Sequence, residues 1–431
     1  MPKMDRFKLD ILAAIFLRGF SAILLFVFYQ QISKKLGVNG AGIFGVIFSI
    51  QTIGVLLCNL GYNESIVKYI AKSFASNDIQ SLNQIINTAR LKVFPYAIIS
   101  IILTFAYVFI NKLQIFDSEV LFFQISLIAF PIIFTEQNAA VLRGIGVFQL
   151  SWVLIGIAVP ATMLLFLNWL PFSYLSISVV VNFYIIINWV VMIISFMLVS
   201  VKLQNKTFVN IKSFVCQCGF KGIYSPLINT SHSLYIISIF TAIMELDIIL
   251  IDYWFGIGQA GIYNIIKKIS LSTSMLLLAV NSVIAPQLSV LFEENNHEDL
   301  KKLVKKIFVL ISLYAIPITF IVIFFSEDIL KLFGQEFITG KKMLLILTAG
   351  QFINIMTGPV GNILIMGGNE RVLQNITIYI SCLGLIGYFI LIPLYGITGA
   401  AWVTALRVML QNIIMFYFVV TIYIIEPKSN R

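Results

Sequence analysis

The sequence predicts an all-α integral membrane protein with about twelve membrane-spanning helices in two related halves. The chain is 59% hydrophobic and 11% charged, and its mean hydropathy of +0.97 lies far above the range of soluble proteins. Apolar runs of about 20 residues, the length that crosses ~30 Å of hydrocarbon, recur along the whole chain. These runs show no alternation of apolar and polar residues, so they predict helices rather than the strands of a membrane barrel.

Each run has the length and composition of one spanning helix. The first half is predicted to contain six helices, centred on 11–32, 42–60, 93–111, 119–139, 149–170 and 174–200. The second half is predicted to contain six more, centred on 223–252, 262–284, 306–325, 343–366, 372–393 and 396–424. We therefore expect an N-terminal six-helix bundle at 1–205, a cytoplasmic linker at 206–222 and a C-terminal six-helix bundle at 223–431.

A repeated phrase is the sign that the two halves are related. Leu36-Gly-Val-Asn-Gly-Ala-Gly-Ile-Phe44 recurs as Phe255-Gly-Ile-Gly-Gln-Ala-Gly-Ile-Tyr263, and each copy ends one apolar run and opens the next. A repeat period this long indicates duplicated halves rather than a solenoid. Many transporters are built from such duplicated halves around a site that opens alternately to either side of the membrane. Transport is therefore the first functional hypothesis.

The distribution of Lys and Arg predicts the orientation in the membrane. The basic N-terminal segment is followed by a full-length apolar run without a small-residue cleavage site, so we expect the first helix to be retained. Most Lys and Arg residues fall in short loops on one side when both termini are placed in the cytoplasm. The net charge of +10 is thus mainly a topology signal, and no nucleic-acid partner is expected.

Cofactor and metal chemistry are not expected from the residues present. The chain has four cysteines and two histidines, with no paired CxxC motif. The string from Gly40 to Gly45 matches a dinucleotide-binding fingerprint, but no predicted strand or βαβ unit surrounds it, so it is interpreted as helix punctuation. A proton or cation gradient remains a possible energy source.

Ionisable side chains inside predicted spanning helices are costly and are functional candidates by default. In the eighth helix, Asn264, Lys267, Lys268 and Ser282 share an arc of roughly 100°, which gives one side of the helix a cationic character. Such a face needs a water-filled cavity or polar neighbours. Asp247 lies at a depth in the seventh helix similar to that of Lys267 in the eighth, so an interhelical ion pair is the alternative to a substrate contact.

Two carboxylates of the seventh helix are expected to point in different directions. In a continuous helix, Glu245 and Asp247 lie on nearly opposite faces. We expect one of them to pair within the second half and the other to face the interface between halves, and the sequence does not say which. Either could couple transport to an ion gradient.

Two arginines complete the candidate anion-binding set. Arg18 lies about 10 Å into the first helix, with no acidic residue at i±3 or i±4 to neutralise it. It is the preferred anion contact, although a side chain of this length could also snorkel to the cytoplasmic interface. Arg407 lies in the middle of the twelfth helix without a close acidic residue. The predicted substrate contacts are therefore Arg18, Lys267, Lys268 and Arg407.

Several segments spread along the chain carry a resemblance to one family. They are the two copies of the repeated phrase, Gly61-Tyr-Asn-Glu-Ser-Ile-Val-Lys-Tyr-Ile70, Leu142-Arg-Gly144, Asp247 and Tyr395-Gly-Ile-Thr-Gly-Ala-Ala401. With these residues the chain resembles the lipid-linked oligosaccharide flippases of bacterial polysaccharide export, the Wzx-type O-antigen translocases of the multidrug/oligosaccharidyl-lipid/polysaccharide (MOP) exporter superfamily. The resemblance covers essentially all 431 residues.

This resemblance implies a MATE-like architecture of two six-helix bundles in a V around a central cationic cavity. It also implies a substrate of undecaprenyl diphosphate carrying a short oligosaccharide, flipped from the cytoplasmic to the periplasmic or outer leaflet by alternating access. The expected location is the bacterial cytoplasmic (inner) membrane, with both termini in the cytoplasm. Expected partners are membrane lipids, the lipid-linked glycan, and a polysaccharide polymerase with chain-length proteins.

Two other functions are less well supported by the residues. A multidrug or cation antiporter of the same superfamily would need acidic residues inside the first-half helices to hold its cations. The basic residue Arg18 lies there instead. A membrane-embedded polysaccharide polymerase would need a sizeable external loop with acidic, Arg or His groups, and the external loops here are short. We therefore expect a transporter and not an enzyme.

Overall fold

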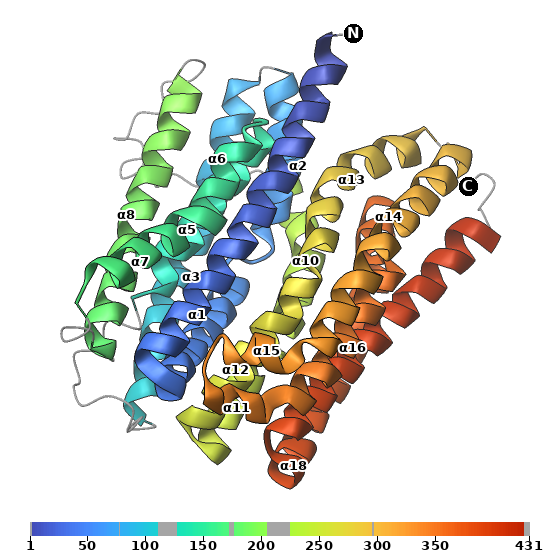
Figure 1. The fold of residues 1–431 in the computed structure, drawn as a ribbon. Coiled ribbons are helices and arrows are strands. Elements are labelled where there is room, and N and C mark those ends of the chain that lie inside the picture. The colour runs from blue at the N-terminus through green and yellow to red at the C-terminus, as the bar shows by residue number, and fades with distance from the viewer. Residues whose placement is uncertain are drawn as a thin grey trace. The chain divides into compact units, whose positions relative to one another are not determined.

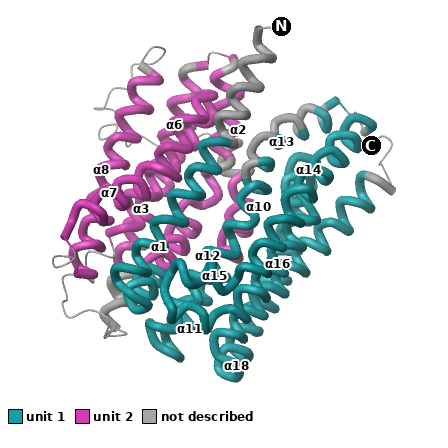
Figure 2. Tube along the Cα trace, viewed as in Figure 1, with its two compact units in different colours: residues 1–46, 243–431 teal, residues 47–242 magenta. Residues whose placement is uncertain are grey.

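The computed structural model describes residues 2–76, 78–110, 127–171, 176–204, 225–294 and 297–425, and within these ranges all regular elements are helices (Figure 1). The chain forms two compact units (Figure 2). Unit 1 combines residues 1–46 with 243–431, and unit 2 comprises 47–242. Each unit is considered by itself below.

The first helix contains a break at a glycine. α1 runs from Pro2 to Cys58, and Gly37 within it has φ 67° and ψ −168°. Residues with a Cβ are strongly disfavoured at this backbone conformation, so a glycine is required here. The break divides α1 into two segments, which correspond to the first and second predicted helices.

Unit 2 is a helical bundle around an apolar core. Ile70, Ile85 and Ile133 are fully buried in that core and come from three different helices. Pro160 lies in the first turn of α7, directly after a short π-helical stretch, where the regular hydrogen-bond ladder is already interrupted. Its helices are α2 (Tyr62–Ala75), α3 (Ile79–Ile110), α5 (Ala129–Gly144), α6 (Phe148–Trp152), the π-helix η1 (Val153–Ile157), α7 (Ala158–Trp169), α8 (Ile177–Gln204) and α10 (Ser225–Ile243, its last residue at the unit boundary).

The half-buried Glu136 of α5 is held by two asparagines within unit 2. Its Oε2 accepts hydrogen bonds from Nδ2 of Asn59 at 3.0 Å and from Nδ2 of Asn63 at 2.9 Å. Asn59 directly follows α1, and Asn63 lies in the first turn of α2. The carboxylate therefore fixes the entry into α2 and has a structural role.

Unit 1 contains most of the broken helices. Breaks occur at Met244 and Glu245, at Ser274, at Gly358 with Pro359, and at Gly396 inside the last long helix. Its further helices are α11 (Leu246–Phe255), α12 (Ile257–Thr273), α13 (Met275–Glu293), α14 (His297–Phe324), α15 (Ser326–Lys331), the 3-10 helix η3 (Gln335–Gly340), α16 (Lys341–Thr357), α17 (Val360–Met366), α18 (Glu370–Val420) and the π-helix η4 (Thr421–Ile425).

Six helices of the described residues are long and apolar enough to cross a membrane, or seven if the bent pair α16 and α17 is one span. Two of these helices, Phe16–Cys58 and Glu370–Tyr423, have 43 and 54 residues. Each is about twice the length of a single crossing and breaks at a glycine, so each contains two predicted spans. Part of the fourth predicted helix and the whole predicted linker at 206–222 lie outside the described residues.

The two copies of the repeated phrase pack against each other inside unit 1. A Cβ on Gly261 would collide with the carbonyl oxygen of Val38 and would lie 2.8 Å from the backbone nitrogen of Gly42. Nδ2 of Asn264 also donates a hydrogen bond to the carbonyl oxygen of Ala41 at 3.1 Å. The glycines of the phrase thus allow the backbones of α1 and α12 to approach closely.

This packing makes the compact units differ from the predicted halves. The α1 segment up to residue 46 belongs to the same unit as residues 243–431, because its glycine-rich end packs on α12. The predicted division at 1–205, 206–222 and 223–431 follows the sequence repeat, whereas the compact units follow side-chain and backbone contacts. The assignment of two six-helix bundles stays a prediction.

Candidate functional site

A helix break in unit 1 determines how the acidic residues are placed. α10 ends at Ile243 and α11 begins at Leu246, and the two residues between them form a turn. The expectation that Glu245 and Asp247 point in opposite directions assumed one continuous helix. That expectation is corrected, because the turn changes the register and brings both carboxylates to the same lysine.

The lysine at the centre of this cluster is Lys267 of α12. Its Nζ lies 2.9 Å from Oδ2 and 3.0 Å from Oδ1 of Asp247, and 3.1 Å from Oε2 of Glu245. The side chain of Asp247 is fully buried, whereas that of Glu245 is 28% exposed. The interhelical ion pair that sequence depth suggested therefore forms, with a second carboxylate added to it.

The Asp247 carboxylate is further stabilised by a chain of buried hydroxyl groups. Tyr263 donates to Oδ2 of Asp247 at 3.1 Å, and its hydroxyl lies 2.9 Å from Oγ1 of Thr404. Thr404 lies in turn 2.8 Å from the hydroxyl of Tyr388. Because an ionised carboxylate only accepts, the single proton of Tyr263 goes to Asp247, which makes Thr404 the donor to Tyr263 and Tyr388 the donor to Thr404.

Sequence reasoning missed this chain of hydroxyl groups. Its signal was present in the repeated phrase, because Tyr263 in the second copy stands where the first copy has Phe44. The hydroxyl is the chemical difference between these two aromatic residues. Thr404 and Tyr388 come from α18, which lies more than a hundred residues farther along the chain, and no local pattern indicates their contact with Tyr263.

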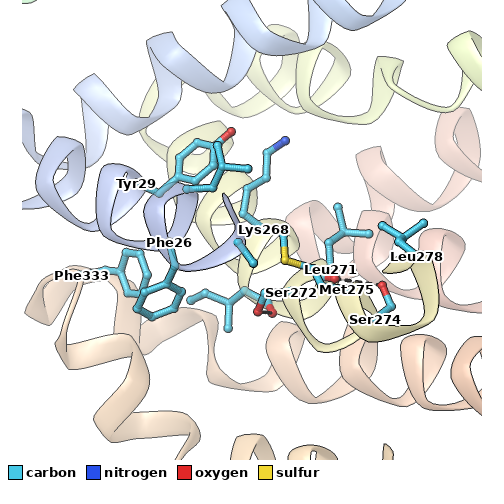
Figure 3. A pocket seen from close by; sticks show the side chains of 12 residues that line it. Phe26, Tyr29, Lys268, Leu271, Ser272, Ser274, Met275, Leu278 and Phe333 are labelled. Atoms are coloured by element: carbon cyan, nitrogen blue, oxygen red, sulfur yellow. Dashed lines mark hydrogen bonds between the residues drawn. The ribbon is translucent and has the colours of Figure 1, made fainter. Parts of the chain in front are cut away.

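Lys268, the neighbour of Lys267, faces a different environment. It lines a cavity of about 250 Å³ within unit 1, together with Tyr29 and Phe26 of α1 and Ser272 of α12 (Figure 3). Its Nζ lies 5.5 Å from the centroid of the Tyr29 ring, which is the range of a cation–π interaction. The two adjacent lysines thus divide between a buried ion cluster and a cavity with mainly apolar walls.

Arg407 of α18 lies beside the turn that carries Glu245. A Cβ on Gly384 would lie 3.1 Å from Sδ of Met244 and 3.4 Å from Cδ of Arg407, so these two side chains meet at the same glycine. Electrostatic attraction from Lys268 and Arg407 acts on the Glu245 carboxylate in addition to that of Lys267. Three cationic side chains therefore act on one partly exposed carboxylate.

Arg18 is half-buried in α1, in the same unit. Ala22, Leu25 and Tyr29 follow it at spacings of four, seven and eleven residues, and all three line the cavity. Residues at these spacings share one face of a helix. Arg18 therefore lies on the helix face that contributes to the cavity, although it is not itself a lining residue.

Metal ligands are not gathered anywhere in the described ranges: no group of three or more His, Cys, Asp or Glu side chains there is arranged to hold an ion. The Asp247 and Glu245 carboxylates have the ammonium group of Lys267 between them instead. The Lys267 ammonium group thus lies where a cation bound by these two carboxylates would lie.

Comparison with a family model and with solved structures shows which known fold the chain shares. Residues 234–391 match the family model described as MatE. A structure described as the inward-facing conformation of a multidrug resistance MATE family transporter of the MOP superfamily matches with a TM-score of 0.71 and 12% identity, over 95% of this chain and 97% of that one. The chain therefore shares the fold of MATE family transporters of the MOP superfamily.

Other structures with the MOP fold match over similar lengths. The multidrug transporter DinF-BH, solved in complex with R6G, matches with a TM-score of 0.66 and 15% identity, over 98% of this chain and 96% of that one. A MOP transporter from Pyrococcus furiosus, whose binding pocket is described as having reverse polarity that suggests a different function, matches with a TM-score of 0.64 and 12% identity, over 95% and 94%. The predicted all-α membrane fold is confirmed, and the chain is a multi-pass integral membrane protein.

Two sequence relatives have names that refer to glycan or polysaccharide biosynthesis. The probable low-salt glycan biosynthesis flippase Agl15 of Haloferax volcanii is 25% identical over 174 residues, which are 40% of this chain and 37% of the relative. The capsular polysaccharide biosynthesis protein CapF of Staphylococcus aureus is 25% identical over 171 residues, 39% of this chain and 43% of the relative. Each match spans less than half of the relative's length. The matched structures named above are described as transporters.

Proposed function

We propose that this protein flips an undecaprenyl-diphosphate-linked oligosaccharide from the cytoplasmic to the outer leaflet of the bacterial cytoplasmic membrane, for surface polysaccharide synthesis. The observation that carries the proposal is the excess of cations in the interior of unit 1. Lys267 contacts two carboxylates there, and Lys268 and Arg407 act electrostatically on one of them, Glu245. An excess of positive charge in a low-dielectric interior attracts an anionic substrate group.

The roles of the cations follow from their surroundings. Lys268 borders the cavity and Arg407 lies beside the exposed edge of the cluster, so these two are the proposed contacts of the diphosphate. Arg18, on the cavity face of α1, is proposed to assist them. Lys267 already has two hydrogen bonds to Asp247 and is proposed to hold the cluster together rather than to bind substrate as its main role.

The charge of the cluster also bears on the rival function, multidrug or cation antiport. A cationic substrate would need carboxylates that are not already paired with a cationic side chain. Asp247 and Glu245 both contact Lys267, which favours an anionic substrate. Coupling to a proton or cation gradient through either carboxylate stays a prediction, as do the orientation of the termini and the polymerase and chain-length partners.

A flipping assay with single substitutions tests the proposal. The full chain is reconstituted in liposomes with a fluorescent undecaprenyl-diphosphate-linked glycan, and the fraction that becomes accessible in the opposite leaflet is measured. We expect Lys268→Gln and Arg407→Gln each to lower the flipping rate at least tenfold, and Arg18→Gln to lower it less. Lys342→Gln, which removes the same charge from an exposed side chain, serves as the matched control.

Two results contradict the proposal. Wild-type rates in both Lys268→Gln and Arg407→Gln, with the control also at the wild-type rate, overturn the assignment of the anion contacts. Transport of a lipophilic cation by the wild type, with no flipping of the lipid-linked glycan, identifies the chain as an antiporter instead.

A further inference from the structure

A cluster of four lysines lies at the start of α14, a helix of unit 1 that is long and apolar enough to span the membrane. The 28 residues of α14 extend over about 42 Å at 1.5 Å per residue, which is the full thickness of a bilayer with its headgroup layers. The lysines lie in the second and third turns, directly before the apolar part of the helix. They are Lys301, Lys302, Lys305 and Lys306.

The position of the lysine cluster along the helix axis matches a headgroup layer. The apolar part of α14, from Ile307 to Phe324, extends over about 27 Å, close to the ~30 Å of hydrocarbon in a bilayer. The segment from Lys301 to Lys306 extends over about 7.5 Å. A headgroup layer is about 5–8 Å thick on each side. With the apolar part in hydrocarbon, the lysine cluster therefore lies among the headgroups.

The lysine cluster also lies on the exposed side of α14. The buried side of the helix, which packs on α13 and α16, contains Leu300, Ile307, Ile311, Ala315 and Val322. On the exposed side, Val309 follows Lys305 after four residues and is 58% exposed. Leu313 follows Lys306 after seven residues and is 75% exposed. Residues at these spacings share a helix face, so the lysine cluster continues into an apolar face that lipid covers.

Three of the four lysines have no carboxylate partner among the described residues. Nζ of Lys302 lies 3.1 Å from Oδ1 of Asp299, so its charge is compensated. Lys301, Lys305 and Lys306 are exposed and form no ion pair within the part of the chain that the structure describes. The positive charge of these three side chains is therefore available to an anionic group outside the protein.

A topology signal alone does not account for this arrangement. The positive-inside rule concerns the side of the membrane on which lysines remain, and it does not require them to share a helix face with lipid-exposed residues. Basic clusters directly next to a spanning helix are typical of sites for anionic lipid headgroups. An acidic protein partner would also be attracted by the positive charge, but it would not need the apolar face that continues from it.

We propose that the lysine cluster of α14 binds the phosphate headgroups of anionic phospholipids, whose acyl chains lie along the exposed apolar face of the same helix. Lys301, Lys305 and Lys306 contact the phosphate oxygens through their ammonium groups, while Lys302 stays with Asp299. A zwitterionic phospholipid carries a compensating cation beside the same phosphate, so the cluster binds it more weakly. This lipid site does not depend on the proposed function.

Binding of two lipids with the same acyl chains and different headgroups tests the proposal. The purified full chain in detergent is titrated with fluorescent phosphatidylglycerol and with fluorescent phosphatidylcholine, and the two Kd values are compared. We expect the wild type to prefer phosphatidylglycerol. The triple variant Lys301→Gln, Lys305→Gln and Lys306→Gln should raise the Kd for phosphatidylglycerol about tenfold and leave that for phosphatidylcholine unchanged. The corresponding triple substitution to Arg keeps the three charges and should retain the preference.

The matched control removes three exposed lysines that lie beyond the other end of α14. In Lys331→Gln, Lys341→Gln and Lys342→Gln the same charge is lost, but Lys331 and Lys341 are paired with Glu327, so the preference should stay at the wild-type level.

Three results overturn the proposal. The first is a wild type that binds both lipids equally. The second is a triple Gln variant that retains the preference for phosphatidylglycerol, or that loses affinity for both lipids to the same degree. The third is displacement of phosphatidylglycerol by an equal concentration of glycerol 1-phosphate, which would identify a soluble phosphate rather than a lipid as the ligand.

Discussion

Replacement of Asp247 by Asn tests the buried ion cluster as a source of stability. The change keeps the shape of the side chain but removes the charge that faces Lys267 at 2.9 and 3.0 Å. Loss of one partner of a buried ion pair costs about 3–5 kcal/mol, because the other charge stays buried without compensation. Glu245 still contacts Lys267 at 3.1 Å, so we expect a loss at the lower end, about 3 kcal/mol.

The free energy of unfolding is measured by reversible denaturation of the purified chain in mixed detergent micelles. A double variant, Asp247→Leu with Lys267→Met, removes both charges and replaces them with apolar side chains of similar size. Such replacements of buried ion pairs are often close to neutral. We therefore expect the double variant to be more stable than Asp247→Asn by about 2 kcal/mol.

Asp252→Asn is the matched control, because Asp252 lies on the same helix α11 but is only half-buried. Its free energy of unfolding should change by less than about 1 kcal/mol. The reasoning is refuted if Asp247→Asn is as stable as the control, or if the double variant is no more stable than Asp247→Asn. Either outcome would mean that the cluster contributes little to the folded state.

Three further substitutions test other parts of the fold. Gly261→Val should cost about 1–3 kcal/mol and reduce the yield of folded protein in size-exclusion chromatography, because its Cβ meets the backbone of α1, whereas Gly19→Ala, with open space around it, should be tolerated. Gly396→Ala should lower stability by about 1–3 kcal/mol in the same denaturation assay, because φ there is 61° and ψ is −148°; an unchanged stability would show that α18 does not need its break. Glu136→Leu should cost about 1–3 kcal/mol by leaving two asparagine donors without their acceptor, and Glu136→Gln should cost less; equal losses would contradict the hydrogen-bond assignment.

The class of the fold could be predicted from the sequence because lipid imposes simple rules on it. Long apolar runs must be helices, since every backbone polar group needs an internal partner in hydrocarbon. The glycines that divide the two longest helices lie close to the predicted boundaries, because Gly37 belongs to the repeated phrase and Gly396 to the motif Tyr395–Ala401. Backbone sterics at these positions are a local property, so the local sequence indicates them.

The candidate site was only partly predictable, for a different reason. The contact between Asp247 and Lys267 could be predicted, because a short turn joins their helices and places the two residues at equal depth. The direction of Glu245 required knowledge of the turn at 244–245, and no Pro or Gly marks that turn in the sequence. The contact of Tyr263 with Thr404 depends on how α12 and α18 pack, which is a property of the whole unit.

Unit 1 combines two segments that are far apart in the sequence, and this affects the order in which its parts are synthesised. Its first helical segment, up to residue 46, leaves the ribosome before unit 2, and its partners begin only at residue 243. At a synthesis rate of roughly 5–20 residues per second, the glycine-rich end of that segment waits roughly 10–40 s in the membrane for α12. During that interval the backbone at Val38 and Gly42, against which Gly261 later packs, faces lipid or the insertion machinery. Biogenesis of this protein therefore depends on a helix that is inserted early and assembled late.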